Sequence, residues 1–143
     1  METSYKVEDT LMHLHITRKH HCVLIQYSDS QKGKLNHARS FITWGEVTLP
    51  VVEELLTKKG RISGDKPLTA EYLSKNSAFK TIPEFAKALF DGKATMKDVK
   101  GLKPMFRLSP PRKGYKHSIK RPFPKGEVGK RGPKINDLIV RMT

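Results

Sequence analysis

The stretch TWGEVTLPVVEELLTKKG, residues 43–60, gives the clearest indication of the fold. Its start is rich in the β-branched and aromatic residues that favour strands. Thr48 is then a good helix N-cap, Pro50 is tolerated in the first helical turn, and Gly60 suits the C′ position after a helix. The stretch predicts a strand followed by an amphipathic helix. The apolar face of that helix is formed by Leu49, Val52, Leu55 and Leu56.

Helix and strand patterns also follow one another in the residues before this stretch. Residues 7–16 have apolar residues at helical spacing, and the apolar run at 21–26 is typical of a buried strand. Residues 32–42 predict another helix, so residues 1–60 are expected to form a small α/β core. The inward face of the helix at 32–42 is predicted to contain Leu35, Ala38, Phe41 and Ile42.

Residues 61–101 predict a helical extension. Thr69 begins a short helix near 70–75, and Thr81 with Glu84 matches a capping box at the start of a longer one. Gly92 then ends this helix, and Thr95 begins another turn that Gly101 stops. The apolar face of the longer helix is predicted to contain Phe85, Ala86, Leu89 and Phe90.

Positive charge is concentrated near the C-terminal end. The formal net charge is +14 over 143 residues. Residues 1–100 hold 16 Lys and Arg against 12 Asp and Glu, whereas residues 101–143 hold 12 against 2. Such an excess destabilises a compact state unless a polyanion neutralises it. The sequence therefore predicts a polyanionic partner for residues 102–143.

The same segment is expected to be extended. Prolines and glycines recur from residue 101 to 134 and exclude a regular helix there. We refer to residues 109–134 as the basic arm. Apolar spacing returns at the end of the chain and predicts a terminal helix that docks on the body, so that residues 102–143 are tied down at both ends. The docking face is predicted to contain Ile135, Leu138, Ile139 and Met142.

Nucleic acid is the polyanion that this composition favours. No segment has the apolar length needed to span a bilayer, and the basic arm is too rich in Pro and Gly to form an amphipathic membrane helix. Cys22 is the single cysteine, which excludes an internal disulfide and a Cys-based zinc cluster. A cytosolic protein with no membrane partner is expected.

Two groups of residues are predicted to bind RNA, since cations neutralise phosphates and an aromatic ring stacks on unpaired bases. The alternatives are a solvated tail for the first group and a solvated helix end for the second. The first group is Arg107, Arg112, Lys113, Tyr115, Lys116, Lys120, Arg121, Lys130 and Arg131. The second, expected to meet in space, is Arg18, Lys19, Lys32 and Lys34.

No catalytic residue, metal site or cofactor is predicted. The histidines near Cys22 lack the carboxylate spacing of metal motifs, and Cys22 lies in an apolar run typical of a buried, inert thiol. A nuclease using His20, His21 or His117 is the enzymatic alternative, but no acid/base pair has a supporting partner in the sequence.

Several motifs together resemble one known family. The sequence is similar, over nearly its whole length, to the archaeal form of large-subunit ribosomal protein thirty, whose eukaryotic relative is called protein seven. The order and spacing of the motifs are specific. They are DTL at 9–11, RKHHCVL at 18–24, TWGEV at 43–47, KGRISGDKPLT at 59–69, GLKPMFRLSPPRKGY at 101–115 and INDLIVRM at 135–142.

The resemblance implies a non-catalytic, structural constituent of the cytoplasmic large ribosomal subunit, with no cofactor. The implied partners are large-subunit ribosomal RNA and neighbouring ribosomal proteins, at a position near the 5S RNA. Without the resemblance, the residues also fit a free-standing RNA-binding or chromatin-type protein that is not ribosomal.

The resemblance also implies an α+β fold: a small ferredoxin-like α/β core at 1–60, a helical extension at 61–101, and the extended basic segment at 102–143. The core is expected to have one antiparallel sheet with helices on one face. The family usually opens with an apolar strand, but Met1 lies almost on the first predicted helix. That strand is therefore expected to be missing, either because the true start lies upstream or because it has been lost.

Overall fold

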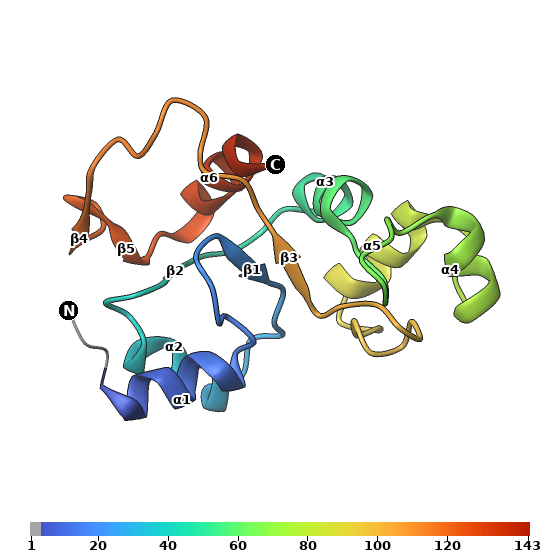
Figure 1. Cartoon of the computed structure of the whole chain (residues 1–143), viewed down its shortest axis with the longest axis horizontal. Coiled ribbons are helices and arrows are strands. Elements are labelled where there is room, and N and C mark those ends of the chain that lie inside the picture. The colour runs from blue at the N-terminus through green and yellow to red at the C-terminus, as the bar shows by residue number, and fades with distance from the viewer. Residues whose placement is uncertain (1–3) are drawn as a thin grey trace.

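A computed structural model describes residues 4–143 and confirms the α+β class (Figure 1). The predicted absence of a strand before the first helix concerns the chain ahead of residue 4 and lies outside the described residues. In chain order the elements are α1 (Tyr5–His13), β1 (His21–Val23), α2 (Asp29–His37), β2 (Thr43–Trp44), α3 (Leu49–Lys59), α4 (Ala70–Asn76), α5 (Ile82–Phe90), β3 (Met105–Arg107), β4 (Ser118–Pro122), β5 (Gly126–Lys130), a short 3-10 turn (Gly132–Lys134) and α6 (Ile135–Met142).

The strands form two small sheets, which corrects the single antiparallel sheet implied by the resemblance. β1 pairs antiparallel with β3, so that Cys22 lies opposite Phe106. β2 pairs parallel with β5, which in turn pairs irregularly with β4. Both N-terminal strands therefore find their partners in the C-terminal third of the chain.

Strands β4 and β5 lie inside the predicted arm, which has no regular structure in its first part, residues 109–117. The Gly and Pro content argued against a helix here but not against strands, and β5 gains backbone partners from the core. Gly129 N–H donates to the Ile42 carbonyl at 2.8 Å, and Arg131 N–H donates to the Trp44 carbonyl at 2.8 Å. These bonds join the arm to the α/β core at β2.

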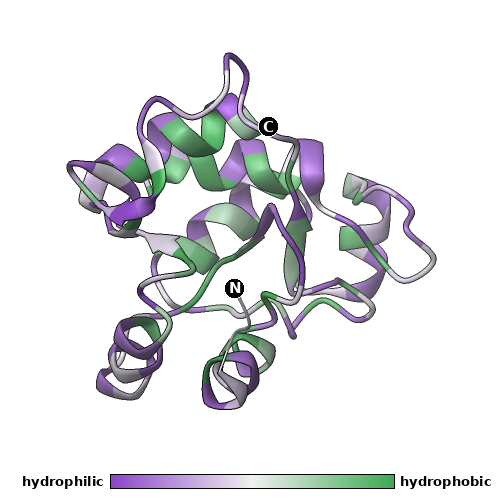
Figure 2. Ribbon diagram, turned by 60° about the vertical axis from the view of Figure 1, so that its left-hand side comes forward, coloured by the Kyte–Doolittle hydropathy of each residue, from purple (hydrophilic) through white to green (hydrophobic). Residues whose placement is uncertain are grey.

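Helices cover the strands on two sides. α1 and α2 lie together on one side, and α3 and α6 lie on the other (Figures 1 and 2). Figure 2 also shows that the loop passing over α6 is largely hydrophilic. A small cluster of Leu14, Leu35, Ala38 and Ile42 packs on the α1–α2 side.

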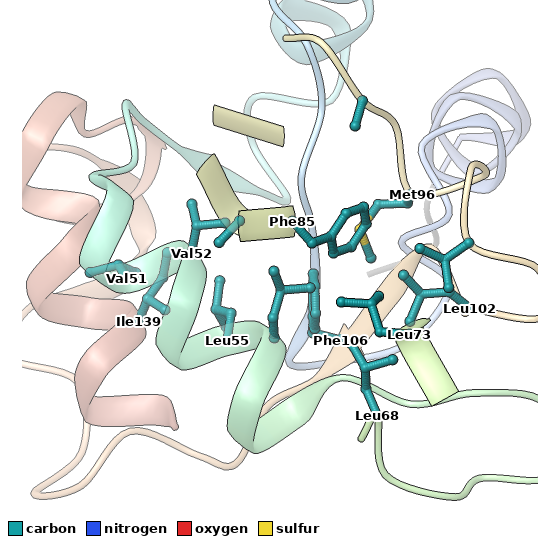
Figure 3. Close-up of a cluster of buried hydrophobic side chains, with 14 of the residues drawn as sticks. Val51, Val52, Leu55, Leu68, Leu73, Phe85, Met96, Leu102, Phe106 and Ile139 are labelled. Atoms are coloured by element: carbon teal, nitrogen blue, oxygen red, sulfur yellow. The ribbon is translucent and has the colours of Figure 1, made fainter. Parts of the chain in front are cut away.

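The main hydrophobic core draws on α3, α4, α5, β3 and α6 (Figure 3). Burying a large aliphatic or aromatic side chain stabilises the fold by about 1.5–3 kcal/mol, so this cluster is the main source of stability. It joins residues from all three predicted segments. Its largest fully buried side chains are Phe85, Phe106, Leu55, Leu56, Leu73, Val52 and Val99, and α6 adds Ile135, Leu138, Ile139 and Met142.

Two aromatic residues predicted to face inward are exposed. Phe41 is 42% exposed because α2 ends at His37 and the chain turns at Ala38, which changes the direction of the following side chains. Phe90 is 52% exposed at the last position of α5. The other predicted core residues of these two helices are buried or pack against the core.

The helix ends differ in detail from the predictions. Thr81 accepts from Glu84 N–H as predicted, but the Glu84 carboxylate accepts from Lys80 N–H at 3.0 Å, one residue before the cap. Thr48 caps α3 without a side-chain hydrogen bond. Gly60 has a φ of −59°, not the left-handed conformation of a C′ glycine. It is needed for space, because a Cβ there would lie 2.3 Å from the Leu56 carbonyl oxygen.

None of the helices in residues 4–143 is both long and apolar enough to cross a membrane.

Candidate nucleic-acid interface

The predicted RNA-binding side chains are exposed, with two exceptions. Lys34 is half-buried on α2, and the side chain of Arg131 is only 9% exposed. The arm residues from Arg112 to Arg121 form one continuous exposed stretch. Most of the predicted cations are therefore available to a partner.

The β1–β3 pairing brings together Arg107, from the first predicted RNA-binding group, and Arg18, from the second. His21 lies opposite Arg107, and Arg18 is close enough to act on the same imidazole. Burial lowers the pKa of His21, and the charges of Arg107 and Arg18 lower it further. His21 is therefore neutral near pH 7, and the positive charge here comes from the two arginines.

Lys32 lines the same hollow as a residue of the arm. Lys32 and Lys130 line a hollow of about 100 Å³ together with Tyr27 and Trp44. The parallel pairing of β5 with β2 places Lys130 opposite Trp44 and so brings the arm to α2. The meeting of Lys32 and Lys34 with Arg18 and Lys19 stays a prediction.

One carboxylate offsets charge at the start of the basic segment. Asp65 forms ion pairs with Lys103 and, at 3.4 Å, with Arg107. The hydrogen bond from Lys103, followed by the charge of Arg107, lowers the pKa of Asp65. Arg107 remains 53% exposed. This surface pair stabilises the fold only weakly and leaves the guanidinium accessible.

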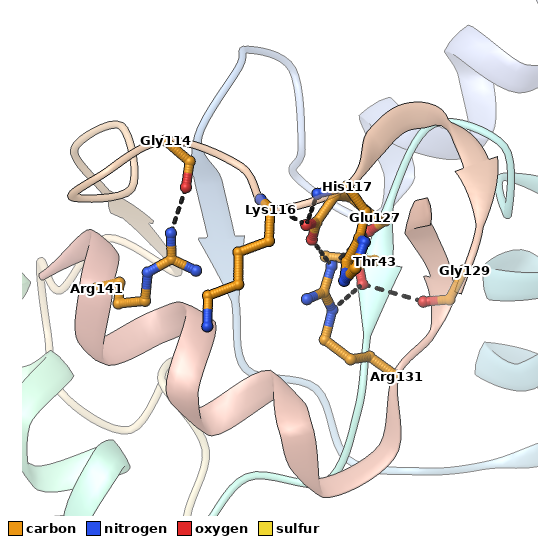
Figure 4. Close-up of polar contacts among 8 residues, drawn as sticks. All are labelled: Thr43, Gly114, Lys116, His117, Glu127, Gly129, Arg131 and Arg141. Carbon is orange, nitrogen blue, oxygen red and sulfur yellow. Dashed lines mark hydrogen bonds and ion pairs between the residues drawn. The ribbon is translucent and has the colours of Figure 1, made fainter. Parts of the chain in front are cut away.

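The first part of the arm is bound to the end of α6. Ser109 N–H donates to the Met142 carbonyl and Arg112 N–H to the Arg141 carbonyl, both at 2.9 Å. The Arg141 guanidinium donates in return to the carbonyls of Arg112, at 3.0 Å, and Gly114 (Figure 4). The arm backbone between residues 109 and 114 is thus fixed against the helix.

Glu127 fixes the next part of the arm. It is a buried carboxylate among cations, and one carboxylate oxygen accepts from the N–H groups of Lys116, at 3.1 Å, and His117, at 3.0 Å (Figure 4). Its other oxygen pairs with Arg131. A carboxylate that accepts backbone and guanidinium hydrogen bonds compensates well for its burial.

Arg131 completes this network. It donates to the Glu127 carbonyl at 2.8 Å and to the Thr43 hydroxyl at 3.3 Å, and that hydroxyl donates to the Gly129 carbonyl at 3.1 Å. Burial alone would raise the pKa of Glu127, but the Arg131 and His117 hydrogen bonds outweigh it and leave the pKa below its ordinary value. The buried pair therefore exists in its charged form at neutral pH.

Sequence reasoning missed the supporting roles of Glu127, Arg141 and Thr43. A signal was present for one of them: Glu127 is one of only two acids in the last 43 residues and lies four residues before Arg131. An acid isolated among cations is expected to have a specific partner. The contacts of Arg141 and Thr43 are long-range in sequence, and no local pattern indicates them.

The described residues contain neither a candidate metal cluster nor an activated thiol. Within the described residues, no group of three His, Cys, Asp or Glu side chains is placed to hold a metal ion. Cys22 packs against the main core, and burial raises the pKa of its thiol to about 12. A thiol with so high a pKa is a poor nucleophile.

The fold and this surface define a class of protein: a small, strongly basic α+β protein that presents cations on a fixed backbone. The chain matches no family model. It is 41% identical to the large ribosomal subunit protein uL30 of Archaeoglobus fulgidus over 137 residues, which cover 96% of this chain and 90% of that protein. It is 47% identical to the uL30 of Nanoarchaeum equitans, over 94% of this chain and 87% of that protein.

A third relative, the uL30 of Staphylothermus marinus, is 46% identical over 95% of this chain and 88% of its own length. The chain therefore belongs to the family of large ribosomal subunit protein uL30.

Proposed function

We propose that this protein is a structural constituent of the large ribosomal subunit that binds and stabilises folded ribosomal RNA. Membership of the uL30 family is the observation that carries this proposal. The family membership also favours a structural over an enzymatic role, and a ribosomal over a free-standing nucleic-acid-binding protein.

The basic arm is the main RNA contact in this proposal. Arginines contact phosphates with two parallel hydrogen bonds, and lysines act as mobile point charges. Releasing the counterions of the neutralised phosphates drives binding. The proposed contacts in the arm and at β3 are Arg107, Arg112, Lys113, Tyr115, Lys116, Lys120, Arg121 and Lys130, followed by Arg18, Lys19, Lys32 and Lys34 elsewhere.

Arg131 has a different place in the proposal. Its guanidinium is occupied by Glu127 and Thr43, so its main contribution is to fix the backbone that carries the other cations. A direct RNA contact from Arg131 stays a prediction.

In this proposal, the fixed backbone lets a segment rich in Gly and Pro bind RNA without a large ordering cost. Ordering a residue's backbone costs about 1–2 kcal/mol, and the contacts of Glu127 and Arg141 meet this cost within the protein fold. Neighbouring ribosomal proteins, and a position near the 5S RNA, are included in the proposal because the family resemblance implies them.

The proposal is tested by competition binding of the full chain to a large-subunit ribosomal RNA fragment. We expect the folded RNA to compete better than duplex DNA of equal charge, since A-form shape and 2′-hydroxyls distinguish the two. Replacing Arg112, Lys113, Lys120 and Arg121 with Gln should weaken binding. Equal competition by duplex DNA would instead support the free-standing chromatin-type protein.

A further inference from the structure

A cavity of about 260 Å³ lies between the arm and α6. Its lining contains the Phe123 ring, the His117 imidazole, four Lys and Arg side chains, and both acidic side chains of the last 43 residues, Glu127 and Asp137. Pockets for drug-sized ligands are roughly 300–1,000 Å³, so this cavity suits a smaller group with both an apolar and an anionic part.

Phe123 is a fixed wall of the cavity. The ring is half-buried, and the Arg131 guanidinium carbon lies 5.4 Å from its centroid. Because Arg131 is held by Glu127 and Thr43, the ring is supported by an immobile cation. The Phe123 N–H is also bonded to the Val128 carbonyl at 2.8 Å. A planar ring fixed in this way is suited to stacking.

Two further cations of the cavity lie near the ring, and one of them sits over its face. Lys116 extends from the arm toward α6 (Figure 4), and the Lys134 ammonium lies 5.6 Å from the Phe123 centroid. Neither forms an ion pair within residues 4–143, although two carboxylates line the same cavity. The Glu127 carboxylate is fully used by Arg131 and two backbone N–H groups.

The other two cations of the cavity are occupied. Arg131 is bound to Glu127, and Arg141 donates to the carbonyls of Arg112 and Gly114. Two of the four cations, Arg131 and Arg141, are therefore held by other groups of the protein. Lys116 and Lys134 form no ion pair with any described residue and can bind an anion.

We propose that this cavity binds one unpaired nucleotide of the RNA, with its base against Phe123 and its phosphate between Lys116 and Lys134. The inference rests on the proposed RNA-binding function and names the RNA feature that this part of the surface recognises. A base-paired helix is too wide for the cavity, whereas a nucleotide that is displaced from a helix exposes the flat face that an aromatic ring binds.

The test compares two RNA hairpins that differ only in one bulged adenosine, titrated with the full chain. The bulged hairpin should bind more tightly by about 5- to 150-fold, the range expected for one stacked base. Phe123→Leu keeps an apolar side chain but removes the aromatic face, so it should abolish this preference. Phe90→Leu, at an exposed site on α5, is the matched control and should keep it.

A second measurement does not depend on the folding of a Phe123 variant. With 2-aminopurine as the bulged base, the wild-type chain should quench the fluorescence through stacking. Lys116→Gln should weaken binding of the bulged hairpin more than that of the paired one, whereas Lys113→Gln should weaken both alike.

Equal affinity of the wild-type chain for the two hairpins, or unchanged fluorescence on binding, would overturn the pocket while leaving the RNA-binding proposal intact. A preference that survives Phe123→Leu would overturn it as well. Failure to bind either hairpin or ribosomal RNA would overturn the proposed function itself, on which the pocket depends.

Discussion

At the scale of single residues, Glu127 has the most unusual position in the molecule. It is a buried acid in the most basic part of the chain, and it binds two arm amides and Arg131 at once. Its carboxylate holds the arm backbone at Lys116 and His117. Through Arg131, which also contacts the Thr43 hydroxyl, it links the arm to β2. We therefore expect the arrangement of the arm cations to depend on this acid.

Glu127→Gln should destabilise the fold by about 3 kcal/mol at pH 7, because Arg131 loses its carboxylate and remains buried as an unpaired charge. Urea unfolding checks this value. Hydrogen exchange should also accelerate at the amides of Lys116 and His117. An unchanged exchange rate at both amides would show that Glu127 does not fix the arm.

The same carboxylate predicts a pH dependence. The pKa of Glu127 in the folded protein lies below its ordinary value of 4.5. Its contribution to stability is therefore complete above that value and is lost as the pH falls through the lowered folded pKa. Wild type should lose stability over this acid range by more than Glu127→Gln does. Parallel pH profiles of unfolding for the two proteins would contradict the assignment.

At the scale of elements, most helices could be predicted and the strand partners could not; α2 spans Asp29–His37 and not the predicted residues 32–42. Apolar spacing and caps such as Thr69 and Thr81 located α4 and α5 closely, since these signals are local. The pairing of β2 with β5 joins residues 43–44 to 129–130, and no local pattern specifies such a contact. In the site, the exposed cations were predictable from charge alone, whereas their anchors Glu127 and Arg141 depended on the tertiary fold.

Gly45 shows how closely two elements meet. A Cβ at this position would lie 2.0 Å from the Gly132 carbonyl oxygen, between β2 and the turn before α6. Gly45→Ala should therefore cost about 1–3 kcal/mol through forced backbone shifts. Gly33→Ala, in the open on α2, is the control and should stabilise by about 0.5–1 kcal/mol. Thermal unfolding of the two variants compares them, and equal effects would exclude the close contact.

α6 is the element that ties the arm to the core. Ile139 on this helix is 7% exposed within the main core, while its neighbour Val140 is 46% exposed. Ile139→Ala should cost about 2–5 kcal/mol, and Val140→Ala should stay within about 0.5 kcal/mol of wild type. Chemical denaturation measures both. A small loss for Ile139→Ala would mean that α6 does not pack as described.

At the scale of the whole molecule, the core and the basic surface share one C-terminal segment. Deleting residues 109–143 would remove the cations, but it would also remove α6 and β5 from the fold. Point substitutions of exposed cations are therefore the appropriate probe of binding. The division of the chain at residues 60 and 101 stays a prediction. The main core contains residues from both sides of each boundary.

Salt dependence measures how many phosphates the surface neutralises. The logarithm of the RNA association constant should fall linearly with the logarithm of salt concentration. Replacing Arg112, Lys113, Lys120 and Arg121 with Gln should reduce the slope by about 0.7–0.9 for each lost phosphate contact. Their exposure predicts little change in stability. A slope that is flat, or unaffected by the four substitutions, would remove the arm from the RNA interface.

Ribosomal membership is the central claim, and the content of purified subunits tests it most directly. The measurement is the amount of this protein, relative to other large-subunit proteins, in large subunits isolated on a salt-containing gradient from the cells that produce it. We predict one copy per large subunit and none in the small subunit. Its absence from intact large subunits, with the protein recovered free or on DNA, would contradict the account.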